Sequence, residues 1–282
     1  MQASLFQAEL RRAAEVIRSA DALFIGAGAG MGVDSGLPDF RGPEGFWKAY
    51  PAYAKLNLDF ASLATADWFD KDPELAWGFY GHRLEQYRST VPHAGFELLR
   101  TWASRMRHGA FVYTSNVDGH FQRSGFPEER IVEVHGSVHY VQCLGGTCKG
   151  LIPATPYSVE VDPETFRARP PLPTCPQCGS LLRPNILMFL DGWWNGSRAL
   201  AQRRQLKPWL DAVPPGKLAI IECGAGTAIP AIRGFCELTA RDRGATLIRI
   251  NVREPQVPEG GIGLPLRALE ALRAIDAELA RP

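Results

Sequence analysis

Four of the six cysteines in this 282-residue chain stand in two close pairs. Cys175 and Cys178 are separated by two residues, and Cys143 and Cys148 by four. Thiolates in two local pairs are typical of tetrahedral zinc, and four protein ligands leave no coordination position open for catalysis. The pattern therefore predicts a structural zinc site, and the alternative is four buried free thiols. The other two cysteines stand in apolar stretches and are predicted to be core residues.

Polar side chains that could move a proton or hold an amide follow two apolar runs. His135 comes directly after RIVEV, and an imidazole whose ordinary pKa is about 6.5 can accept a proton at neutral pH. Asn116 and Asp118 follow AFVYT and could bind an amide group or position a water. The alternatives are a structural histidine and a simple Asx-type turn.

A glycine-rich stretch, GAGAGMGVDSGLPDFRG at 26–42, follows the apolar run ALFI. Glycine lets main-chain N–H groups approach a ligand closely, which suits phosphate binding. The dinucleotide fingerprint G-x-G-x-x-G fails, because Met31 and Val33 occupy the positions where its third glycine would stand. No second strand ending in an acidic residue follows about 20 positions later. The stretch therefore indicates a nucleotide site that differs from the common dehydrogenase pattern.

The elements that must position these residues are short apolar runs that alternate with helical patterns. The runs are 22–28, 110–116, 130–136, 218–224 and 246–251. This alternation is typical of a parallel sheet covered on both faces. Ligands of such sheets bind beyond the carboxyl ends of the strands, so the polar residues above are expected to meet there.

Residues 140–183 interrupt the alternation with prolines, glycines and the clustered cysteines. We therefore predict an α/β fold with a doubly wound, Rossmann-like domain of parallel strands, formed by 1–139 and 184–282. A smaller inserted zinc-binding module is predicted at 140–183, and the helical part of the small domain is expected within 44–90.

The composition is that of an ordinary globular protein, with 45% hydrophobic and 22% charged residues. A formal net charge of +1 provides no field that would attract nucleic acid, so no such partner is predicted. The N-terminal residues show helical spacing broken by charges, which is unlike a secretory signal, and no stretch approaches a membrane span. We expect a cytoplasmic protein without a membrane partner, and its oligomeric state is left open.

Taken together, the motifs resemble those of the sirtuin family of NAD-dependent protein deacylases. The family's G-A-G-x-S-x-x-S-G-I-P-D-F-R-G corresponds to 28–42, T-x-N-x-D-G to 114–119, and His-Gly-Ser to 135–137. The cysteine pairs, RPNILMF at 183–189 and IN at 250–251 follow in family order. The resemblance covers nearly the whole chain.

The resemblance implies NAD as co-substrate, a structural zinc and an acyl-lysine protein or peptide as partner. It implies that His135 is the general base for the ribose hydroxyl, and that Asn116 and Asp118 bind the amide of nicotinamide. The products would be nicotinamide, O-acyl-ADP-ribose and free lysine. The NAD-binding residues that it implies are Gly28, Ala29, Gly30, Asp39, Phe40, Arg41, Ser115, Asn116, Asp118, Gly224, Gly226 and Asn251.

Some positions depart from the family pattern. Gly32 replaces the usual serine, Ala27 a threonine, and Ser115 a glutamine that touches ribose. NAD binding is therefore expected to be weaker or differently arranged. The family's substrate-clamping Phe-Gly-Glu reads Phe189-Leu190-Asp191 here, which is expected to alter how an extended peptide adds as a strand.

The stretch WGFYGHRLEQYR at 77–88 is predicted to be a helix on which Tyr80 and Arg83 share a face. It resembles the F-Y-x-x-R of the family branch that removes succinyl and malonyl groups. A guanidinium paired with a phenol could hold the distal carboxylate of an acidic acyl chain. The alternative is a solvated arginine beside a core tyrosine. With Phe189, these two residues complete the predicted substrate-binding set.

Two other functions stay open at this point. An NAD glycohydrolase or ADP-ribosyltransferase would use the same pocket with a different acceptor. A non-catalytic module that binds NAD or ADP-ribose is disfavoured, because Phe40, Asn116, Asp118 and His135 are all present.

Overall fold

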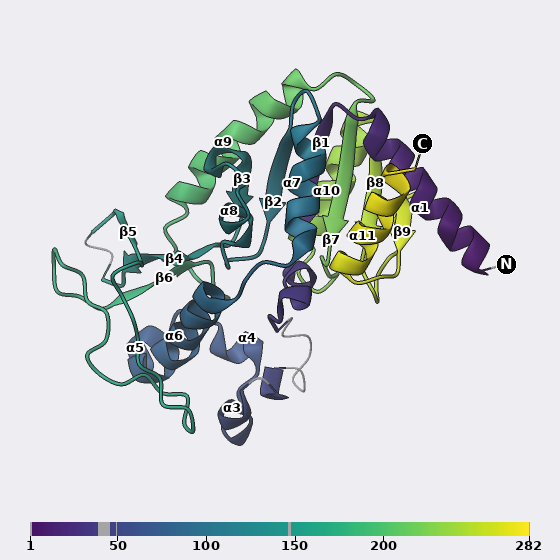
Figure 1. Ribbon diagram of the computed structural model, residues 1–282. Helices are drawn as coiled ribbons and strands as arrows, with labels where there is room; N and C mark the ends of the chain where they lie inside the picture. The colour runs from purple at the N-terminus through teal and green to yellow at the C-terminus, as the bar shows by residue number, and fades with distance from the viewer. Residues whose placement is uncertain (1, 39–45, 49, 146–147, 282) are drawn as a thin grey trace.

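A computed structural model describes residues 2–38, 46–48, 50–145 and 148–281 of the chain (Figure 1). Asp39, Phe40 and Arg41, to which the resemblance assigns NAD contacts, lie outside the described residues. Among the described residues, no helix combines the length and the apolar character needed to cross a membrane.

The larger of two sheets has six parallel strands in the order β3-β2-β1-β7-β8-β9. The strands are β1 (Ala22–Ala27), β2 (Ala110–Thr114), β3 (Ile131–Glu133), β7 (Leu218–Cys223), β8 (Thr246–Ile250) and β9 (Ile262–Leu264). The first five lie within the five predicted runs, because parallel strands buried on both faces are continuously apolar. The edge strand β9 was not predicted, since its three residues are too few to form a recognisable run.

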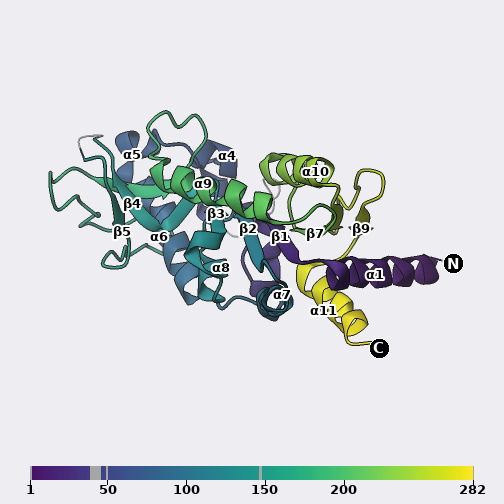
Figure 2. The ribbon, with the colours of Figure 1, turned by 90° about the horizontal axis from the view of Figure 1, so that it is seen from above.

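Helices cover both faces of this sheet, as Figure 2 shows. One face is packed by α1 (Gln2–Ser19), α7 (Ala94–Ser104) and α11 (Ala268–Leu279). The other face is packed by α9 (Ser197–Ala212) and α10 (Ala231–Arg243). The predicted doubly wound α/β fold is therefore confirmed.

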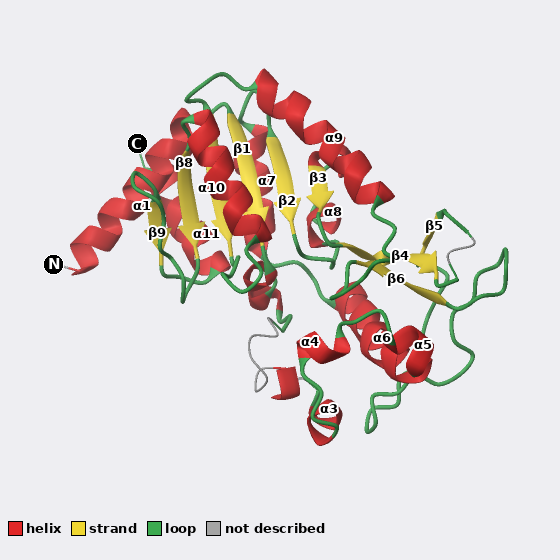
Figure 3. Ribbon diagram, turned by 180° about the vertical axis from the view of Figure 1, so that it is seen from behind, coloured by secondary structure: helices red, strands yellow, loops and turns green. Residues whose placement is uncertain are grey.

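The smaller sheet is antiparallel, with the strand order β5-β4-β6. Its strands are β4 (Gly136–Cys143), β5 (Leu151–Pro153) and β6 (Leu182–Ile186). The helices α3 (Pro51–Lys55), α4 (Phe60–Leu63), α5 (Trp68–Lys71) and α6 (Pro73–Ser89) share a separate, aromatic-rich core with it. In Figure 3 the strand arrows of the larger sheet point toward this smaller part of the molecule.

Helix α6 contains the predicted helix at 77–88 and has a well-defined start. The Asp72 carboxylate accepts a hydrogen bond from the Leu75 N–H, and Pro73 occupies the first helical position, where its missing N–H costs nothing. The same carboxylate pairs with Arg167, at 2.7 Å. This pair ties the helix to the loop between β5 and β6. Further short helical turns include η1 (Ala29–Met31), η2 (Val33–Ser35), α8 (His120–Arg123) and η3 (Glu128–Arg130).

Candidate active site

Two glycine-rich turns meet where β1 and β7 end. The Gly28 N–H donates to the Cys223 carbonyl (3.0 Å), and the Gly30 N–H donates to the Gly224 carbonyl (3.1 Å). A Cβ on Gly30 would lie 2.6 Å from the Cα of Gly224, so a larger residue does not fit. The glycines are thus required first by contact between the two turns, whereas the sequence indicated approach to a ligand.

The meeting point of these turns is where the chain reverses its direction of winding. Strands β2 and β3 lie on one side of β1, and β7, β8 and β9 lie on the other. In open parallel sheets the crevice beyond such a point is where dinucleotides bind. The arrangement therefore fits NAD, although the G-x-G-x-x-G fingerprint is missing.

The loop after β2 is held against the first glycine turn. The Asn116 side-chain amide donates to the Gly28 carbonyl (3.0 Å), and the Ser115 N–H donates to the Ala27 carbonyl (3.1 Å). The buried Asp118 carboxylate accepts from the His120 N–H at the start of α8 (2.9 Å). Asn116 and Asp118 therefore make turn contacts, as the alternative of an Asx-type turn predicted. These contacts fix both residues at the crevice.

His135 lies in the two-residue connection between the two sheets, two residues after the end of β3 and directly before β4. Its carbonyl accepts a hydrogen bond from the Leu187 N–H (2.9 Å). Burial lowers the pKa of His135, and a hydrogen bond with the backbone of Ser115 opposes this in part. The imidazole is therefore neutral at pH 7 and able to accept a proton.

Gly136 is what allows His135 to occupy this connection. Its φ is +78°, in the region that favours glycine, and a Cβ there would lie 2.1 Å from the carbonyl oxygen of Asn185 on β6. The glycine of the His-Gly motif is thus required by the close approach of β4 and β6.

Histidines around Asp118 were missed by the sequence analysis. The His139 ring forms a hydrogen bond with the Asp118 carbonyl through Nε2 (2.8 Å). His120 is fully buried, and neither of its ring nitrogens has a hydrogen-bond partner among the described residues. Burial lowers the pKa of both rings, so both are neutral at pH 7. The position of His120 two residues after Asp118 was the available signal.

The second glycine turn is positioned by Asn251, which follows β8. Its side-chain amide donates to the Ala225 carbonyl (2.8 Å), and its Oδ1 accepts from the N–H groups of Arg253 and Glu254. Asn251 is buried, so these contacts use both ends of its amide. Its described contacts therefore hold the loops around Ala225, next to Gly224 and Gly226.

Arg83 and Tyr80 share a face of α6, as predicted, with the Arg83 guanidinium 5.8 Å from the centroid of the Tyr80 ring, and both residues are buried. The phenol that accepts hydrogen bonds from the Arg83 guanidinium is that of Tyr87, one turn further on, with Nε at 3.0 Å. Tyr80 instead stacks on Phe69, and burial raises its pKa to about 12. The alternative of a solvated arginine is excluded, because Arg83 is 7% exposed.

Phe189 lies between this aromatic region and the connection that carries His135. Its N–H donates to the Ala64 carbonyl (2.9 Å), and its ring packs edge-to-face against Phe60 at 6.2 Å between centroids. The Arg83 guanidinium lies 5.9 Å from the centroid of the same Phe60 ring. A line of contacts therefore joins Arg83 to Phe189.

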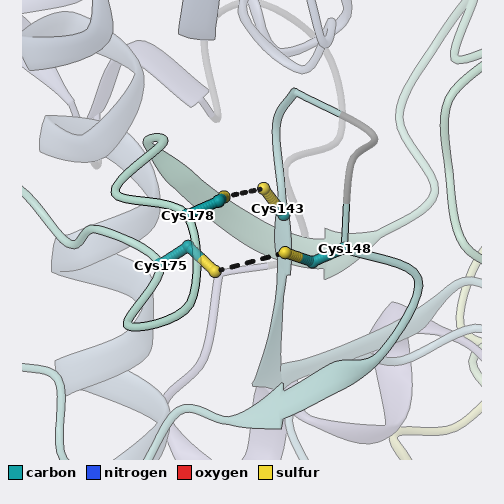
Figure 4. Close-up of side chains that lie close together, drawn as sticks. All are labelled: Cys143, Cys148, Cys175 and Cys178. Atoms are coloured by element: carbon teal, nitrogen blue, oxygen red, sulfur yellow. Dashed lines mark hydrogen bonds between the residues drawn. The ribbon is translucent and has the colours of Figure 1, made fainter.

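The four clustered cysteines converge as the sequence predicted (Figure 4). All four sulfurs lie within 4.8 Å of one another, with Cys143 and Cys178 at 3.3 Å and Cys148 and Cys175 at 3.8 Å. Sulfurs about 2.3 Å from a tetrahedral zinc are about 3.8 Å apart, so the donor set fits this metal. Cys223 and Cys236 are buried in the larger part, as predicted.

Comparisons with known proteins agree on one family. A model of the Sir2 family matches residues 28–203. An NAD-dependent protein deacylase of Aeropyrum pernix is 32% identical over 254 residues, with 86% of each chain covered. The mitochondrial NAD-dependent protein deacylase sirtuin-5 of Danio rerio is 34% identical over 176 residues, which cover 57% of this chain and 54% of that protein.

A solved structure agrees with these sequence comparisons. A crystal structure of a Sir2 homologue in complex with NAD has a TM-score of 0.68 with this chain at 25% identity. The match covers 95% of this chain and 94% of that one. The chain, whose motifs resemble those of sirtuins, therefore belongs to the Sir2 family.

Proposed function

We propose that His135 is the catalytic base with which this Sir2-family enzyme removes acyl groups from lysine. The chain is an NAD-dependent protein deacylase that uses NAD as co-substrate and acyl-lysine peptide as substrate. The observation that carries the proposal is a neutral, largely buried imidazole in the connection between the two sheets, beside the loop after β2. A base held there can take a proton at neutral pH.

We propose a single orientation for NAD in the crevice, with its nicotinamide end at β2 and its adenosine end at β7 and β8. Asn116 and Asp118 would hold the carboxamide of nicotinamide, because both lie at the carboxyl end of β2 and the amide can pair with an amide and a carboxylate. The turn at 28–30 would then lie along the pyrophosphate. The adenosine half extends the other way, over the ends of β7 and β8, where Gly226 and Asn251 lie.

In the reaction, the acyl oxygen of the substrate attacks the anomeric carbon of the nicotinamide ribose, and nicotinamide leaves. His135 accepts the proton of the 2′-hydroxyl as that oxygen attacks the acyl carbon, and water then completes the release of lysine. The products are nicotinamide, free lysine and O-acyl-ADP-ribose.

Nicotinamide release measured with and without an acetyl-lysine peptide tests this proposal. We expect release that depends on the peptide and matches the free lysine formed mole for mole. Nicotinamide release that is equally fast without peptide would instead identify an NAD glycohydrolase. Release that depends on a different acceptor would identify an ADP-ribosyltransferase. No release in either case, with NAD still bound, would identify a binding module.

We also propose an organisation and a location to go with this function. The substrate would enter between the domain formed by 1–139 with 184–282 and the module at 140–183, next to His135. A cytoplasmic location is supported by the zinc site, since four clustered thiolates that bind metal must stay reduced.

For the acyl group, we propose that Arg83 binds a distal carboxylate, so that succinyl-lysine is a substrate. The guanidinium lies within a set of aromatic rings, 5.2 Å from the centroid of Phe79 and 5.3 Å from that of Tyr87. In such surroundings a charge-assisted bond to a carboxylate is stronger than in water. Acetyl offers no group that could make this bond.

Replacing Arg83 by methionine is expected to lower kcat/KM for a succinyl-lysine peptide by a factor on the order of 10 to 10², the value of one charged hydrogen bond. Wild-type enzyme is expected to remove succinyl at least as efficiently as acetyl. The acetyl peptide, assayed with the same variant, controls for damage to the fold. Equal losses on both peptides, or no succinyl activity in the wild type, would show that Arg83 does not read the acyl group.

A further inference from the structure

The last residue of β3 is a buried glutamate, two positions before His135. The Glu133 side chain is 1% exposed, on a strand whose other two residues, Ile131 and Val132, are apolar. Burial raises the pKa of Glu133, because an ionised carboxylate loses its hydration there. An apolar side chain would avoid this cost, so the charge at this position calls for a reason other than stability.

Arg198, in the first turn of α9, supplies the charge that balances this carboxylate. Its Nη1 lies 2.6 Å from Oε2 of Glu133, and among the described residues no other cation pairs with Glu133. The charge of Arg198 opposes the rise in the pKa of Glu133. Its Nη2 meets the carboxylate of Glu128, so one planar guanidinium binds two carboxylates. A guanidinium engaged at both ends is fixed in position and in orientation.

The same guanidinium also contacts the smaller sheet. Its Cζ lies 4.5 Å from the centroid of the Tyr140 ring, on β4, within the range of a cation–π contact. Glu133 precedes His135 by two residues, and Tyr140 follows it by five. The Arg198 side chain therefore holds the chain on both sides of His135, once in the larger sheet and once in the smaller.

Helix α9 is itself attached to both sheets, so Arg198 extends from a fixed backbone. Gln202, one turn after Arg198, accepts a hydrogen bond from the Glu133 N–H through its Oε1 (3.0 Å). Just before the helix, the Asn195 N–H donates to Oε1 of Gln142 on β4 (3.0 Å). In Figures 1 and 3 the helix begins near β4 and β6 and runs beside β3. Arg198 is therefore held by the same two sheets that it connects.

We propose that Arg198 is a positioning residue, which sets the place of His135 by joining Glu133 to Tyr140. It acts through the chain on either side of the base rather than on NAD or substrate. The inference rests on the proposed role of His135 and adds a residue from a helix that the sequence analysis did not connect with the site. Stability alone does not account for the pair, because apolar residues in place of a buried ion pair are often neutral or stabilising.

Two reactions of the same enzyme separate a loss of position from a loss of fold. Exchange of labelled nicotinamide into NAD, with acetyl-lysine peptide present, reports the first step and its reversal, in which the base takes no part. Single-turnover formation of free lysine also requires the later step, in which His135 accepts the proton. Loss of a positioning residue is expected to lower the second rate and to leave the first nearly unchanged, whereas a damaged fold lowers both.

Glu133→Leu combined with Arg198→Met removes the ion pair without leaving a buried charge. The Tm and the Kd for NAD are expected to match those of the wild type. Formation of free lysine is expected to fall about tenfold, because a catalytic group misplaced by about 1 Å can lose about 10²-fold in rate. Arg198→Lys keeps the charge but loses the planar fork, so its rate should lie between those of the double variant and the wild type.

The matched control is Arg203→Met, which removes an arginine of the same helix. Arg203 contacts the Tyr113 hydroxyl on β2 instead, so this variant should keep both rates. A double variant that has the wild-type Tm and forms lysine at the wild-type rate overturns the inference. An equal fall in lysine formation and nicotinamide exchange also overturns it, because that result identifies a purely structural pair. If the double variant does not fold, wild-type lysine formation by Arg198→Lys has the same meaning.

His135→Ala distinguishes failure of this inference from failure of the proposed base. If His135→Ala forms lysine at the wild-type rate, the proposed base is wrong and the positioning role falls with it. If His135→Ala loses lysine formation while the double variant keeps it, the base stands and the positioning role of Arg198 alone is wrong.

Discussion

Replacing His135 by alanine should lower the rate of deacylation by a factor on the order of 10² or more, the usual contribution of a positioned base. The Kd for NAD should stay nearly unchanged, because the residues assigned to the dinucleotide lie on other loops. Isothermal titration of NAD and single-turnover formation of free lysine measure the two quantities. His108→Ala is the matched control, since His108 lies at the other end of the strands, next to the start of β2.

The pH dependence gives a second measure of the same role. The neutral imidazole is the active form, and burial lowers the pKa of His135 below its usual value of about 6.5. The rate should therefore stay high as the pH falls from 7 to 6.5 and decline only at lower pH. Full deacylation by His135→Ala, or an acid limb that is the same in the variant as in the wild type, would rule out the proposed base.

Cys175→Ala should abolish zinc binding and unfold the small antiparallel sheet. Cys175 is buried beside the other three thiols, and the cluster connects the end of β4 to the loop before β6. Structural zinc contributes about 10 kcal/mol or more to the folding of small modules, more than a three-stranded sheet can replace. Metal analysis measures the zinc, and hydrogen exchange measures the protection of β4 and β6.

In the Cys175→Ala variant, amide hydrogen exchange should become faster in 136–143 and 182–186. It should change little in β1 and β7, whose core is separate. Cys236→Ala, which removes a buried thiol outside the cluster, should keep its zinc. Freshly purified, unchelated protein that holds no zinc, or a Cys175→Ala variant with native protection in the small sheet, would contradict the assignment.

Local patterns in the sequence were enough to predict the elements and the metal ligands. Strands such as LAIIEC at 218–223 are buried on both faces, so every residue except Glu222, which pairs with Arg249, is apolar and the run is visible without a partner. The zinc ligands were visible for a similar reason, because chelation imposes short spacings on neighbouring cysteines. The strand order was decided by packing, and β9, with three residues, carried too little local signal.

Functional contacts between distant segments could not be predicted in the same way. Tyr87 and Tyr80 both lie on α6, and spacing alone does not choose which phenol meets Arg83; packing of Tyr80 on Phe69 decides it. Likewise, Asp191 pairs with Arg183, a residue on β6, and no local motif indicates this pairing. Such choices depend on side chains that approach from elsewhere in the fold.

The sequence by itself determined the α/β class, the strand ends at which polar residues gather, and the four sulfur ligands, because each depends on burial or chelation within a few residues. The tertiary structure decided that Gly30 and Gly224 must be glycine, because their backbones come into contact across β1 and β7. It also decided that His135 stands between two sheets rather than at the free end of one. Both facts depend on how strands that are far apart in the sequence pair with one another. The energy of that pairing is shared by many residues, so it is not visible in a single motif.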